Sequence, residues 1–267
     1  MATHSPTHGS AQTLHQKPHV EQMDPPLPAR ETLPTMYDLP SEDPEEPGLP
    51  DEYHSLQPQL LSATLHLPNY AADEVFSVGD MNLYYDVTHP LWHKRPDWFA
   101  VAGVSRLYEG RDLRLSYVVW QERVNPFVVV ELLSPSTEAE DLGQTQRGRA
   151  ETPMVPPTKW EVYEQILRIP YYIVFDRYTN QLRAFHLVGG HYQAMDVSDQ
   201  RVAIAAWEVS LGVWQGSYRG VERLWLRWFD ASGQVIPTAE EQAEQAQAKS
   251  DRLAQRLREL GINPEDV

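Results

Sequence analysis

Three charged residues stand in stretches otherwise suited to a protein core. Asp97 lies in PDWFAV, Glu131 follows the run FVVV, and Lys159 lies in TKWEVYEQILRI. A buried charge is costly unless an opposite charge, hydrogen bonds or a metal compensates it. We therefore expect these three side chains to be one another's partners, or two of them to be ligands of a cation.

The segment 158–169 predicts a helix that directs Lys159 inward. On a wheel of about 100° per residue, Lys159 falls in the middle of the apolar face. The apolar positions around it are Trp160, Val162, Tyr163, Ile166, Leu167 and Ile169, and the charged face carries Glu161, Glu164, Gln165 and Arg168. The helix dipole disfavours a cation in the first turn. A specific carboxylate partner for Lys159 is therefore expected.

Two carboxylates and a lysine suit metal-assisted hydrolysis of a phosphodiester. Asp97 and Glu131 would hold a hard cation such as Mg²⁺ or Mn²⁺. The cation would polarise a phosphoryl oxygen and help to ionise a water, and Lys159 would stabilise developing charge or position that water. The alternative is structural: a buried Glu131–Lys159 pair, with Asp97 capping a turn. Residue types and periodicity leave both interpretations open.

The elements that must position these residues can be predicted in outline. The continuous apolar run before Glu131, within 126–133, is typical of a strand buried on both faces at the centre of a sheet. Thr158 and Glu161 form a capping box that starts the helix of Lys159, and the connection 138–158 before it is long for a compact domain. Further segments are expected as a partial helix at 51–67, two short strands or a hairpin at 75–87, strands at 98–104, 115–120 and 171–176, a hairpin at 181–197, and shorter strand-like pieces in the Trp-rich region 202–229.

Composition divides the chain into three parts. Residues 1–48 predict a disordered, Pro-rich and acidic leader, because ten of the 22 prolines lie within the first fifty residues. Residues 49–232 predict the folded domain. Residues 236–262 predict a C-terminal helix whose apolar residues are spaced alternately three and four apart, the pattern of a short coiled coil. That helix would either pack on its own domain or form a homodimer.

Charge and residue usage exclude several classes of protein. The chain has no cysteine, so it forms no disulfide or thiolate metal site. The sequence contains no apolar run long enough for a transmembrane helix, and we expect a soluble cytoplasmic protein with no membrane partner. The net charge of −16 argues against non-specific nucleic-acid binding. However, residues 31–93 carry twelve acidic and no basic residues, whereas 94–230 carry seventeen acidic and sixteen basic residues, so the body can present a local basic face.

Three motifs in order resemble one known family. PDWFAV, VVVELLSPST and the spacing K-x-x-x-Y from Lys159 to Tyr163, followed by YYIVFD, are similar to the Uma-type family of restriction-endonuclease-like proteins in the PD-(D/E)XK nuclease superfamily. The resemblance covers about residues 50–230. It implies an α/β fold with a mixed central sheet flanked by helices, to which this chain adds C-terminal strands and a helix.

The resemblance also implies a site and a substrate. Asp97 matches the aspartate of the PD motif, and Glu131 matches the following acidic position, so both would be metal ligands. Leu133 stands where the superfamily has its lysine, and Lys159 fits the position to which that lysine has moved. The implied activity is Mg²⁺-dependent cleavage of DNA by an endonuclease. The alternative is a catalytically silent scaffold or interaction protein that keeps the fold. Secondary candidates are His54, for a catalytic role, and His93, Lys94 and Arg95, for phosphate contacts.

Overall fold

A computed structural model describes residues 24–28, 51–134, 137–145, 155–260 and 263. The chain divides into two units, Met1–Asp51 and Glu52–Val267. All the helices and strands described below belong to the second unit. Most of the leader predicted at 1–48 lies outside the described residues, so its disorder stays a prediction.

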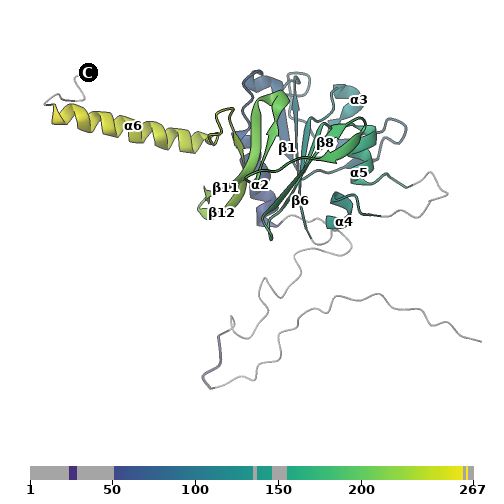
Figure 1. The fold of residues 1–267 in the computed structure, drawn as a ribbon, viewed down its shortest axis with the longest axis horizontal. Helices are drawn as coiled ribbons and strands as arrows, with labels where there is room; N and C mark the ends of the chain where they lie inside the picture. Colours follow the sequence, from purple (N-terminus) through teal and green to yellow (C-terminus); the bar gives the residue numbers. More distant parts are fainter. Residues whose placement is uncertain (1–23, 29–50, 135–136, 146–154, 261–262, 264–267) are drawn as a thin grey trace, which may run out of the picture. The chain divides into compact units, whose positions relative to one another are not determined.

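A six-stranded mixed sheet forms the centre of the second unit (Figure 1). Its order is β1 (Val75–Gly79), β4 (Trp98–Ala102), β6 (Val128–Leu132), β7 (Tyr171–Asp176), β8 (Gln181–Val188) and β9 (His191–Ala194). The β6–β7 pair is parallel and the other neighbouring pairs are antiparallel. Every residue of β6 is buried. The prediction of a central strand is therefore confirmed, as is the β8–β9 hairpin.

One face of this sheet is covered by a helix and a second sheet. The helix is α2 (Glu52–Thr64), and the sheet consists of β10 (Arg201–Ile204), β11 (Val209–Tyr218) and β12 (Val221–Phe229), with the short helix η3 (Ala205–Trp207) between β10 and β11. The buried Gln57 side chain bridges α2 to the backbone of Leu226 in β12. Trp225 and Trp228 pack in the same core as Val128 and Val130 of β6. These two tryptophans of β12 are thus part of the core.

The opposite face carries the shorter elements. These are the sheet of β3 (His93–Lys94), β2 (Leu83–Tyr84) and β5 (Tyr117–Val118), with η1 (Ala72–Glu74), α3 (Val119–Glu122), α4 (Glu138–Asp141) and α5 (Lys159–Glu161). Of the two expectations for 75–87, separate strands are correct, because β1 and β2 belong to different sheets. The strand predicted at 115–120 is too long at both ends, because β5 contains only Tyr117 and Val118. Leu115 is 98% exposed and α3 begins at Val119.

The helix of Lys159 begins as predicted but changes its winding. Thr158 and Glu161 form the capping box, and α5 then continues as a π-helix, η2 (Val162–Ile166). A π-turn contains more residues than an α-turn, so a wheel of uniform pitch misplaces the residues that follow. Glu164, predicted on the charged face, is buried and accepts the backbone N–H of Tyr192 at 2.7 Å. Ile166, predicted on the apolar face, is 43% exposed.

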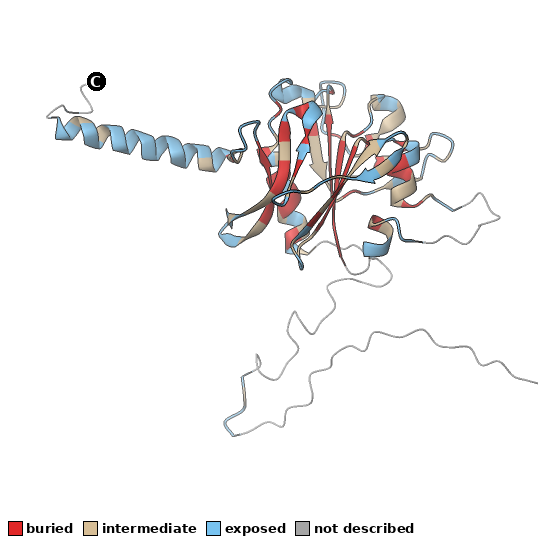
Figure 2. Cartoon of the chain, viewed as in Figure 1, coloured by how far each residue is buried: buried red, intermediate tan, exposed pale blue. Residues whose placement is uncertain are grey.

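The last element is a long helix, α6 (Ala239–Glu259), capped by Thr238 and Glu241. None of its residues is buried, and Figure 2 shows it almost wholly exposed. Its first turn is tied to β12, because the buried Arg227 guanidinium pairs with Glu241 at 2.7 Å. In the described ranges of the chain, no helix is long and apolar enough to cross a membrane.

Candidate active site

The two predicted acids face each other on neighbouring strands. Asp97 directly precedes β4, and the pairing of Trp98 with Val130 places it opposite Glu131 of β6. The backbone N–H of Asp97 donates to Glu131 Oε2 at 3.2 Å, and the backbone N–H of Leu132 donates to Asp97 Oδ2 at 2.6 Å. Each carboxylate is therefore held by the backbone of the other's strand.

Lys159 reaches both this pair and a third acid. Its Nζ lies 3.2 Å from Glu131 Oε2 and 2.8 Å from Asp141 Oδ1. The capping box fixes the start of α5, so the residue after Thr158 is directed at the sheet. The three residues singled out from the sequence thus converge in one cluster, and Lys159 has the carboxylate partners that its inward position predicts.

Asp141 is the member of the cluster that sequence reasoning missed. Its side chain is 1% exposed and pairs with Lys159. Its carbonyl oxygen accepts the Tyr172 hydroxyl at 2.8 Å, and its Oδ2 is buried with no hydrogen-bond partner among the residues that the structure describes. The helix α4 has only four residues, too few for periodicity to distinguish Asp141 from its acidic neighbours Glu138 and Glu140.

Tyr163 supports the cluster from η2. Its hydroxyl donates to Glu131 Oε1 at 2.9 Å, and the residue is fully buried. Glu131 therefore receives hydrogen bonds on both oxygens, from Tyr163 on one and from the Asp97 N–H on the other, in addition to the ammonium of Lys159. Tyr163 is the last residue of the K-x-x-x-Y spacing that begins at Lys159, and that spacing alone predicts no role for its hydroxyl.

Burial shifts each pKa in this cluster against the charged form of the group, whereas a neighbouring opposite charge shifts it towards the charged form. Desolvation raises the pKa of Glu131 well above its usual value, and Asp141 and Asp97 raise it further, although Lys159 acts against this shift. Desolvation also raises the pKa of Asp97, with Lys159 and His54 opposing it. Burial alone would lower the pKa of Lys159, but the carboxylates of Glu131, Asp141 and Asp97 raise it above its usual value. Lys159 is therefore a charged ammonium at neutral pH.

The secondary candidates lie at the edge of the cluster. His54 Nε2 lies 3.1 Å from the carbonyl oxygen of Leu132, next to Glu131. Lys94 pairs with Glu140 at 3.3 Å, and Glu140 also accepts the backbone N–H of Lys159 at 3.0 Å. Through Glu140, Lys94 therefore helps to fix the start of α5.

The remaining basic candidates are more exposed. Arg95 forms an ion pair with Asp80 at 2.6 Å, and its side chain is 58% exposed. His93 is exposed, and its ring packs on Tyr84 with centroids 5.1 Å apart. Since Arg95 already has a carboxylate partner, any phosphate contact would have to replace that pair.

The donor set fits a cation held by few protein ligands. Within the described ranges, no group of three or more His, Cys, Asp or Glu side chains is arranged to hold a metal ion. Mg²⁺ is usually bound by one or two carboxylates, with waters and substrate phosphates completing the shell. Asp97 and Glu131 place two carboxylates together on adjacent strands, and Asp141 Oδ2, buried without a hydrogen-bond partner among the described residues, belongs to the same cluster.

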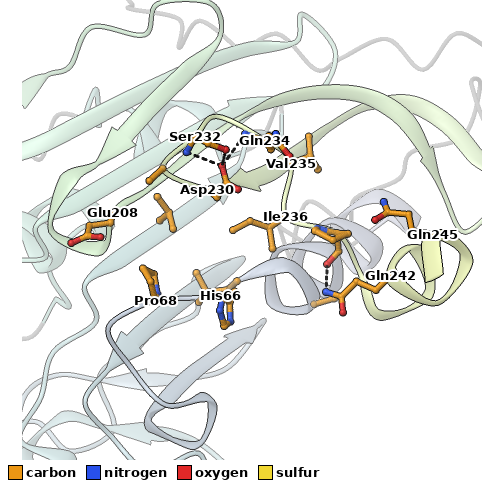
Figure 3. A pocket seen from close by; sticks show the side chains of 15 residues that line it. His66, Pro68, Glu208, Asp230, Ser232, Gln234, Val235, Ile236, Gln242 and Gln245 are labelled. Carbon is orange, nitrogen blue, oxygen red and sulfur yellow. Dashed lines mark hydrogen bonds between the residues drawn. The ribbon is translucent and has the colours of Figure 1, made fainter. Parts of the chain in front are cut away.

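A cavity lies away from this cluster. Its volume is about 750 Å³, and Figure 3 shows it between the loop after α2, the turn after β12 and the start of α6. Its lining includes Asp230, but that carboxylate accepts N–H groups from Ser232 and Gln234 and closes a local turn. The Asp230 carboxylate is therefore used within its own turn, and none of the three residues predicted from the sequence lines this cavity.

The fold and the cluster define the class of this protein. A mixed sheet that carries two acids on adjacent strands, with a lysine on the following helix, is a restriction-endonuclease-like arrangement. The model of the Uma2 family, described as "Putative restriction endonuclease", matches residues 22–214. The chain therefore belongs to the Uma2 family, within the PD-(D/E)XK restriction-endonuclease-like superfamily. No curated protein matches the chain with significant similarity.

Proposed function

We propose that this protein is a metal-dependent endonuclease that hydrolyses DNA phosphodiester bonds. The observation that carries the proposal is a surplus of negative charge. Three carboxylates, those of Asp97, Glu131 and Asp141, surround the single ammonium of Lys159. When ionised, these three carboxylates carry two more negative charges than the one ammonium compensates. A divalent cation would balance this charge.

Asp97 and Glu131 would hold the cation, Mg²⁺ or Mn²⁺. When bound, such a cation polarises a phosphoryl oxygen and lowers the pKa of a coordinated water. The chain's own contribution is to fix the two carboxylates before the cation arrives. Backbone N–H groups and the Tyr163 hydroxyl hold them in place, so little side-chain entropy remains to be lost on binding.

Lys159 would stabilise the negative charge that develops on the scissile phosphate. Its ammonium remains protonated because three carboxylates raise its pKa, and hydrogen-bond donors fixed in advance stabilise a developing charge most effectively. Asp141 acts here as a positioning residue, since its Oδ1 fixes Lys159 Nζ at 2.8 Å. DNA as the substrate rests on membership of the family and on the balanced charge of the body.

Plasmid cleavage with matched variants tests this proposal. Wild-type protein with Mg²⁺ or Mn²⁺ should nick or linearise supercoiled plasmid, and EDTA should abolish the cleavage. Glu131→Gln should lose both cleavage and the increase in melting temperature caused by the metal, because it removes a ligand charge. Glu138→Gln is the control, since it makes the same change on an exposed position of α4 and should retain both properties.

A second candidate is a catalytically silent scaffold with the same fold. It is favoured by the hydrogen bonds that Glu131 already makes through both oxygens and by the absence of a three-ligand metal group from the part of the chain that the structure describes. If neither cation raises the melting temperature and no DNA substrate is cut, the scaffold should replace the nuclease as the proposed function.

A further inference from the structure

The helix α6 exposes an apolar seam along its length. The seam consists of residues spaced alternately three and four apart, namely Ala243, Ala246, Ser250, Leu253, Leu257 and Leu260. Leu253 is 57% exposed and Leu260 is 67% exposed, and Figure 2 shows that most of the helix is exposed. A helix with such a stripe gains stability by burying it against another helix.

The side chains of the seam become larger from the N-terminal to the C-terminal end of α6. Its first half carries small residues and its second half carries only leucines. In a parallel pair of copies, small residues would face small residues at one end and leucines would face leucines at the other, so no single interhelical distance would pack both ends well. In an antiparallel pair, each small residue faces a leucine. The resulting layers pair Ala243 with Leu260, Ala246 with Leu257 and Ser250 with Leu253, each occurring twice.

The charges of α6 are graded in the same direction. Residues 239–248 contain three acidic and no basic residues, whereas 249–260 contain four basic and two acidic residues. An antiparallel pair brings the acidic half of one copy alongside the basic half of the other. It also opposes the two helix dipoles. Against this, the two copies of Lys249 approach each other near the centre and weaken the association.

We propose that the exposed face of α6 binds a second copy of this chain, as an antiparallel two-helix pair. The grading of size and the grading of charge favour this occupant independently, and neither depends on the nuclease proposal. The Arg227–Glu241 pair ties the first turn of α6 to β12, so this contact would link two folded units. A pair of helices this short buries little area, so the dimer should be weak and concentration-dependent.

Sedimentation equilibrium of the full chain tests the association. The wild type should shift from monomer towards dimer as its concentration rises. Leu253→Asp with Leu257→Asp should remain monomeric, because both charges enter the seam. Ala248→Asp with Gln255→Asp adds the same charges on the opposite face and should dimerise like the wild type. A wild type that stays monomeric at every concentration would overturn the proposal.

Disulfide trapping tests the orientation, and the chain suits it because it has no cysteine. Ala243→Cys and Leu260→Cys are made as separate variants and oxidised alone and mixed. In the antiparallel pair, equivalent positions lie roughly 25 Å apart along the axis, so cross-linked dimer should form mainly in the mixture. Cross-linking of each variant with itself, and no gain on mixing, would show a parallel pair and refute the proposed arrangement.

Discussion

Replacing Lys159 with methionine would test whether its ammonium compensates the buried acids. Methionine keeps most of the apolar stem and removes the charge. From the sequence, the sign of the effect is open, because deleting a buried charge also removes its desolvation cost. The structure decides the sign: Lys159 contacts Glu131 and Asp141, whose side chains are 0% and 1% exposed. Both carboxylates would lose their cation, so we expect destabilisation.

The expected loss is about 3 kcal/mol. Removing one partner of a buried ion pair costs about 3–5 kcal/mol. We take the lower end because the Lys159 side chain is 16% exposed and because Glu131 keeps its hydrogen bonds to Tyr163 and the Asp97 N–H. For a unit of this size, that loss corresponds to a fall in melting temperature of about 6–12 °C.

The loss should depend on pH. The pKa of Glu131 is raised in the folded state, so its ionisation destabilises the fold as pH rises from the unfolded value of 4.5 through the folded value. The Lys159 ammonium opposes this rise in the pKa of Glu131, whereas a methionine at position 159 does not. The difference in stability between wild type and Lys159→Met should therefore be small in acid, where the carboxylates are protonated in both proteins, and grow towards neutral pH.

Chemical denaturation in EDTA, followed by tryptophan fluorescence, measures this difference. The control is Lys94→Met, since Lys94 is buried to a similar extent but pairs with Glu140, whose side chain is 39% exposed. That substitution should cost less than about 1 kcal/mol. If Lys159→Met costs no more than Lys94→Met, or if its cost does not vary with pH, the reasoning about the carboxylate cluster is wrong.

Two further predictions concern contacts around the fold and the site. Glu241→Gln should destabilise the start of α6 by about 2 kcal/mol, because the buried guanidinium of Arg227 loses its ion pair. The hydrogen bond from Arg227 lowers the pKa of Glu241, so this contribution is present above 4.5 and disappears as pH falls through the folded value; equal stability of the two proteins at neutral pH would contradict it. Tyr163→Phe should cost about 1–2 kcal/mol and weaken metal-induced stabilisation, because Glu131 loses a donor. Unchanged values in a thermal melt with and without Mn²⁺ would show that this hydroxyl does not hold the site.

The sequence alone determined the central strand and the presence of a charged cluster. A continuous apolar run has few structural solutions, so 126–133 had to lie inside a sheet, and Glu131 with it. The inward position of Lys159 followed from the helix period together with the capping box, since both act within one turn. These signals are local, and local geometry fixes which way a side chain leaves the backbone.

Only the tertiary structure decided which residues complete the cluster. Asp141 contacts Lys159 across eighteen positions of sequence, and a four-residue helix carries no periodic signal that would point it inward. The π-turn of η2 exchanged the environments of Glu164 and Ile166, and Glu164 accepts a hydrogen bond from the backbone of Tyr192 in β9, a residue distant in the chain. The two strands at 75–87 joined different sheets for the same reason: strand pairing is a non-local choice among partners distant in the chain.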